Sequence, residues 1–79
     1  MQKHSHYYKD VRHLDQIDVY RVLDLFEVTD SCLQHAAKKL LVAGGRGHKD
    51  LERDINDVID SCNRFLEMRR EDATKCRTE

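Results

Sequence analysis

The residue types best suited to binding chemistry gather in one stretch, residues 35–55, HAAKKLLVAGGRGHKDLERDI. All three glycines of the chain stand there, at positions 44, 45 and 47, with basic side chains around them. Glycines let backbone N–H groups approach a ligand closely, and positive side chains favour an anion. We therefore expect a phosphate-binding site in this stretch. Its predicted residues are His35, Lys38, Gly45, Arg46, Gly47, His48 and Lys49.

The same stretch has a purely structural alternative, which the sequence leaves open at about even weight. A turn between two helices often needs glycine, and basic residues near the end of a helix offset its dipole. A Walker loop is excluded because the spacing GxxxxGK[ST] is absent. The basic face of His35, Lys38 and Lys39 also has a plain interpretation, as a solvated helix surface.

The N-terminal residues His4, His6, Tyr7 and Tyr8 form a second candidate region. A tyrosine in an arm that folds over a site can stack on a nucleobase, which makes Tyr7 and Tyr8 predicted base-stacking residues. The alternative is that these tyrosines pack on a helix. Two histidines alone are too few to hold a metal ion, so no metal site is predicted here.

Acidic residues dominate the segment after the glycines, and Asp50, Asp54 and Asp57 share one face of the expected helix. Such a face can hold Mg²⁺ beside phosphates. The favoured interpretation is that these carboxylates face solvent or pair with Lys49, Arg53 and Arg64. No metal, cofactor or catalytic residue is predicted, and enzymatic activity is left open, with the balance against it.

The composition limits the classes of function. The chain has 79 residues, which allows one domain, and a formal net charge of −1, which argues against general nucleic-acid binding. No apolar run is long enough to cross a membrane, and the start MQKHSHYYKD is too polar for a signal peptide, so we expect a cytoplasmic protein. Three widely spaced cysteines do not form a disulfide framework.

The apolar periodicity is helical nearly throughout and predicts an all-α fold of about three helices, a helical hairpin plus one packed helix. The expected organisation is a flexible arm over 1–13, a helical domain over 14–70 and a polar tail over 71–79. The helices are expected over 15–27, from an N-cap at Thr29 or Asp30 to the glycines, and from Lys49 or Asp50 to about Arg70. Because the first helix is widely apolar, we also expect a homo-oligomer that forms through it.

A series of motif residues runs along most of the chain, in the order His6, Tyr7, Lys38, Gly45, Lys49, Asp50 and Leu51. This order resembles the SaV-like bacteriophage family, a small domain that also occurs in a phage nucleotide kinase without a Walker loop. The resemblance spans roughly residues 6–68. This chain differs where the family has an asparagine, an aromatic residue and an arginine, which are here His35, Lys39 and Val42.

The resemblance implies a phage protein that acts in the cytoplasm of the bacterial host. The leading hypothesis is a protein that binds a phosphate-bearing nucleotide without turnover and so sequesters a host defence signal. The alternative is an interaction module that binds and inhibits a host protein, with the acidic face of Asp50, Asp54 and Asp57 as a mimic of nucleic acid. A nucleotide kinase or its accessory subunit is the third hypothesis.

Overall fold

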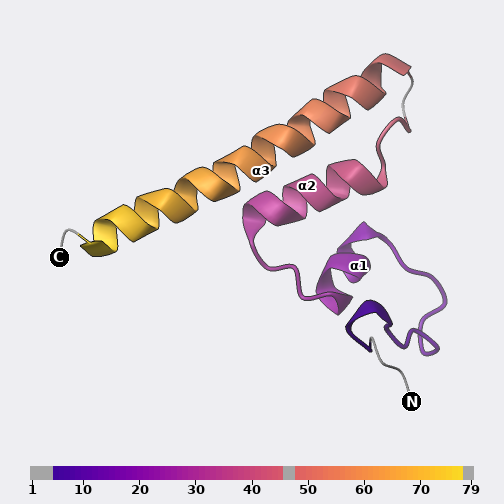
Figure 1. The fold of residues 1–79 in the computed structure, drawn as a ribbon. Coiled ribbons are helices and arrows are strands. Elements are labelled where there is room, and N and C mark those ends of the chain that lie inside the picture. Colours follow the sequence, from indigo (N-terminus) through magenta and orange to yellow (C-terminus); the bar gives the residue numbers. More distant parts are fainter. Residues whose placement is uncertain (1–4, 46–47, 78–79) are drawn as a thin grey trace.

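The computed structural model describes residues 5–45 and 48–77, with side chains described over 6–45 and 50–74. These residues form a 3-10 turn, η1 (Ser5–Tyr7), and three helices, α1 (Val19–Leu25), α2 (Ser31–Leu41) and α3 (His48–Arg77). Helices α2 and α3 run antiparallel as a hairpin, and the short α1 packs against α2 (Figure 1). The predicted all-α hairpin with one packed helix is confirmed.

Helix α1 is shorter than the expected range 15–27. It begins at Val19 because Asp18 has an extended backbone and its carboxylate accepts a hydrogen bond of 2.9 Å from the backbone N–H of Arg21. An N-cap of this kind satisfies a backbone donor that has no partner inside the helix. The aspartate that starts α1 is therefore Asp18 rather than Asp15.

The end of α1 has the hydrogen bonds of a Schellman motif. The N–H of Val28 donates to the carbonyl of Leu23 at 2.9 Å, and the N–H of Glu27 donates to the carbonyl of Asp24 at 3.1 Å. Glu27 takes the left-handed position of this motif, with φ at 57°, where glycine is the usual residue. The chain therefore turns sharply towards α2 at a strained residue.

Helix α2 has the predicted start, because the Asp30 carboxylate accepts a hydrogen bond of 2.9 Å from the backbone N–H of Leu33. The helix ends before Gly44, whose φ of 77° few other residues adopt. A Cβ atom at Gly44 would lie 3.3 Å from Cδ1 of Leu51, so the glycine also lets the turn approach α3 closely. The structural role of the glycines in a helix–helix turn is therefore seen at Gly44.

Helix α3 continues beyond its expected end near Arg70 and reaches Arg77. Neither glycine nor proline interrupts residues 48–77. The Arg64 guanidinium pairs with the Glu67 carboxylate at 2.6 Å and with the Glu71 carboxylate at 3.0 Å, which links successive turns. These carboxylates raise the pKa of Arg64. The polar segment after Glu71 is helical as far as Arg77.

The segment between η1 and α1 has turns but no helix or strand in its described residues. Its clearest contact is local: the Arg12 guanidinium lies 2.7 Å from the Asp10 carboxylate, and hydrogen bonds from Arg12 lower the pKa of Asp10. The predicted division into arm, domain and tail remains a prediction.

The residues of α2 and α3 that are fully buried are small or charged. Ala36 of α2 and Asp54 of α3 are buried, and the Asp54 residue is only 1 % exposed. Lys39 reaches across the hairpin, with its Nζ atom 3.4 Å from the Asp54 carboxylate and 3.2 Å from that of Asp57. Neither Lys39 nor Asp54 belongs to a solvated face, because each is held against the neighbouring helix.

The large aliphatic residues expected in the core remain mostly uncovered. Leu40 is 58 % exposed, Ile59 50 % and Leu66 48 %, while among the described apolar residues only Leu23 and Ala36 are buried. The apolar faces of α2 and α3 are therefore largely uncovered in this single chain. The Cα radius of gyration, 16.3 Å, agrees with this open arrangement, because a compact domain of this length has about 12 Å.

Candidate functional site

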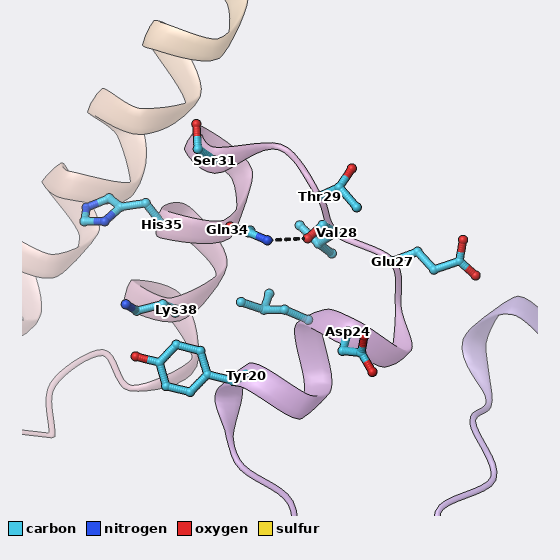
Figure 2. Close-up of a pocket in the computed structure, with 10 residues that line it drawn as sticks. Tyr20, Asp24, Glu27, Val28, Thr29, Ser31, Gln34, His35 and Lys38 are labelled. Carbon is cyan, nitrogen blue, oxygen red and sulfur yellow. Dashed lines mark hydrogen bonds between the residues drawn. The ribbon is translucent and has the colours of Figure 1, made fainter.

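The main candidate site is an open pocket of about 490 Å³ between α1 and α2 (Figure 2). The end of α1 and the loop after it provide one wall, and one face of α2 provides the other. The residues that give it chemical character are Tyr20, Asp24, Glu27, Gln34, His35 and Lys38.

Local hydrogen bonds hold the loop that forms part of one wall of the pocket. The Nε2 atom of Gln34 donates to the backbone carbonyl of Val28 at 2.8 Å, as Figure 2 shows. With the Schellman bonds at Glu27 and the N-cap at Asp30, this bond connects the end of α1 to the first turns of α2. The positions of the pocket walls therefore follow from three local motifs.

The basic part of the pocket is built by α2 with support from α1. The Nζ atom of Lys38 lies 5.3 Å from the centre of the Tyr20 ring, a cation–π arrangement. His35 lies one helical turn before Lys38 and lines the same pocket. An aromatic ring, an ammonium group and an imidazole are thus available together for an anionic group with a flat ring system.

The acidic part limits what the pocket can hold. Asp24 and Glu27 line it together with Lys38 and His35, so both signs of charge are present. Carboxylates near a phosphate raise the cost of binding it. The pocket therefore suits a ligand of mixed polarity better than a highly charged polyphosphate.

Of the predicted phosphate-binding residues, the described side chains of His35 and Lys38 come together in the pocket. The N–H of Gly45 donates to the carbonyl of Val42 at 3.1 Å, so this backbone donor is already used within the turn. Arg46 and Gly47 lie outside the described residues. His48 and Lys49 open α3, and their side chains lie outside the described part of the chain.

The predicted base-stacking residues do not line this pocket. Tyr7 and Tyr8 are exposed, and the Tyr7 ring contacts its neighbour His6 at a centroid distance of 4.1 Å. The aromatic residue beside Lys38 is Tyr20. The sequence offered no signal for this pair, because Tyr20 and Lys38 lie on different helices and Tyr20 falls within the apolar pattern of α1.

The acidic face of α3 is also rearranged relative to expectation. Asp54 and Asp57 both pair with Lys39 of α2, and Arg64 pairs with Glu67 and Glu71 of its own helix. Among the residues that the structure describes, no group of three or more histidine, cysteine or acidic residues has the geometry to hold a metal ion. The buried Asp54 removes the centre of the proposed nucleic-acid mimic.

In the described ranges 5–45 and 48–77, no helix is both long and apolar enough to span a membrane. The chain matches no family model, no curated protein and no solved structure.

Proposed function

We propose that this chain is a non-enzymatic interaction module that acts by binding a protein through its helical hairpin. The observation behind the proposal is an uncovered surface, here called the apolar side. Leu40, Ile59 and Leu66 are each about half exposed on it. The apolar side consists of Leu33 and Leu40 of α2 and of Leu51, Ile55, Ile59 and Leu66 of α3.

An uncovered apolar surface of this kind leaves an isolated chain without much of its possible hydrophobic stabilisation. Full burial of one leucine or isoleucine side chain stabilises a protein by about 1.5–3 kcal/mol. Small domains are marginally stable even when their apolar residues are covered. A protein that covers the apolar side therefore supplies much of the stabilisation that the hairpin lacks alone.

This proposal keeps the interaction hypothesis and changes its surface. The acidic mimic is not retained, because Asp54 is buried against Lys39. The resemblance to a phage family makes a bacterial host protein one kind of partner in this proposal, and the cytoplasm of the host the place of action.

Native mass spectrometry of the chain purified gently from bacteria tests this function. We expect the chain within a protein complex that the Ile55→Lys variant loses. The matched control is Asn56→Lys, which adds the same charge at an exposed neighbouring position. A folded chain that is found alone, or a complex that both variants lose equally, would contradict the proposal.

A second candidate function is binding of a nucleotide-like ligand without turnover, as a means to sequester a host defence signal. The Lys38 ammonium beside the Tyr20 ring, in one pocket with His35, favours this candidate. Calorimetric titration with AMP and ADP tests it, and Lys38→Ala should abolish any binding. Lys9→Ala is the matched control, because the Lys9 Nζ also lies 5.3 Å from a ring centre, that of Phe26, but does not line the pocket.

A further inference from the structure

We infer that a second copy of this chain covers the apolar side, with the two α3 helices antiparallel. This inference rests on the interaction module proposed above and names its partner. Two hairpins that meet through their apolar sides form a four-helix bundle with a twofold axis.

On α3, the apolar residues lie beside the face that contacts α2. Successive residues of an α-helix are rotated by about 100°. Ile55 and Ile59 are consequently turned by about 100–140° from the buried Asp54, and Leu66 by about 120°. The contact with α2 and the apolar stripe are therefore separate faces of one helix, and α2 does not cover the stripe.

On α2, the leucines are turned in the same sense. Leu33 and Leu40 are rotated by about 40–60° from the buried Ala36. When two antiparallel helices face each other, positions turned in the same sense lie on the same flank of the pair. The leucines of α2 and the stripe of α3 therefore form one continuous surface.

The exposed area agrees with a missing partner of this size. The accessible surface of the chain is 7005 Å², whereas a compact monomer of 9.3 kDa exposes about 5,000 Å². The excess is about 2,000 Å². Permanent dimers bury roughly 1,000–2,500 Å² on each subunit, so one copy per chain accounts for the excess.

The charge pattern of α3 favours a copy that runs antiparallel. Residues 48–62 contain five acidic and two basic residues, whereas residues 63–77 contain five basic and three acidic residues. An antiparallel pair centred near Ile59 places residues 48–58, with four acidic and two basic residues, along residues 60–70 of the other copy, with three basic and two acidic residues. A parallel copy would place like charge along like charge.

The apolar stripe itself is nearly symmetric about Ile59. Leu51 and Ile55 precede this residue, and Cys62, which is exposed, and Leu66 follow it. In an antiparallel pair centred on Ile59, Leu51 of one copy lies opposite Leu66 of the other. A surface that is complementary to itself in this way is what a twofold interface requires.

Sedimentation equilibrium tests the dimer. We expect twice the chain mass of 9.3 kDa for the wild type. The Ile59→Lys variant should raise the dissociation constant at least about 100-fold, because each interface loses two buried isoleucines. Asn56→Lys is the control: it adds the same charge at an exposed position that is turned by about 60–140° from the stripe residues, and it should leave the constant within about threefold. Circular dichroism of both variants verifies that the helices remain.

Cysteine cross-linking tests the direction of the pair. In a background with Cys32→Ser, Cys62→Ser and Cys76→Ser, a single cysteine at Ile59→Cys should cross-link two copies under mild oxidation. A single cysteine at Leu51→Cys should not, because two such residues lie about 24 Å apart in an antiparallel pair. Efficient cross-linking at both positions would show a parallel pair and overturn the antiparallel arrangement.

The outcomes separate this inference from the proposed function. A folded wild-type monomer at about 100 µM overturns the second copy, since stable interfaces of this size associate far below that concentration. If that monomer binds a different protein and Ile59→Lys abolishes the complex, the interaction module stands with another partner. A folded monomer that binds no protein overturns both.

Discussion

The two faces of the α2–α3 hairpin differ in burial: its large aliphatic residues lie on the more exposed face. The face between the helices carries Ala36, Lys39 and the nearly inaccessible Asp54, whereas the apolar side carries large residues such as Leu40 and Ile59 that remain half exposed. Small residues let two helices approach closely, and an ion pair between them selects one alignment. The comparison indicates that the internal contact sets the register of the hairpin, while most of the available hydrophobic stabilisation depends on association.

The largest expected effect on the internal face comes from Lys39→Ala. This substitution removes a cation that the Asp54 and Asp57 carboxylates share. We expect the free energy of unfolding to fall by about 3 kcal/mol. This value is near the lower end of the range for buried ion pairs, because the Lys39 side chain is partly exposed. Urea denaturation measures the change. The double variant Lys39→Met, Asp54→Leu should recover most of the loss, and a loss below about 0.5 kcal/mol in the single variant would contradict this role.

A smaller loss is expected when the internal face is made larger. Ala36→Leu inserts a bulky side chain at a buried position of α2, and overpacking of this kind lowers the free energy of unfolding by about 1–3 kcal/mol. The matched comparison is Leu40→Ala on the apolar side. The free energy of unfolding of the wild type and of both variants is measured below the concentration at which the chains associate. A larger loss in the free energy of unfolding for Leu40→Ala than for Ala36→Leu would contradict the view that the internal face, and not the apolar side, stabilises the isolated chain.

The turn that joins the two helices is the next most sensitive position. Gly44→Ala should destabilise the hairpin by about 1–2 kcal/mol, because φ is 77° and the new Cβ would crowd the Leu51 side chain. Glu27→Gly should act in the opposite direction by about 1 kcal/mol, since glycine fits the left-handed end of α1 without strain. Thermal unfolding followed by circular dichroism measures both effects. If both variants were stabilised, or both destabilised, the positive φ angles at these two positions would not explain the changes.

The smallest effect is expected at the exposed ion pairs of α3. Arg64→Ala removes contacts with Glu67 and Glu71 that lie in solvent, so the free energy of unfolding should fall by much less than in Lys39→Ala. The loss should shrink further in 1 M salt, where such charges are screened. A loss as large as that of Lys39→Ala would remove the distinction between the buried and the exposed ion pairs.

The candidate pocket shows where prediction from sequence succeeded and where it stopped. His35 and Lys38 were recognisable as a basic pair because their spacing places them on one face of a helix. Tyr20 was not recognisable as their neighbour, since its position depends on how α1 packs against α2. The N-H group of Gly45 was predicted to be available for a ligand, yet the turn uses it in a hydrogen bond to Val42.

The sequence by itself determined the local structure of this chain. The helical periodicity, the N-cap at Asp30 and the turn at Gly44 each depend on interactions between residues a few positions apart. Only the tertiary structure decided which face of each helix is covered. That choice depends on the fit between two helices. Here Ala36 and Asp54 are buried and Lys39 pairs with Asp54 across the hairpin, while Leu40, Ile59 and Leu66 remain about half exposed. Hydrophobic periodicity marks a face that favours burial but does not state which neighbour will bury it.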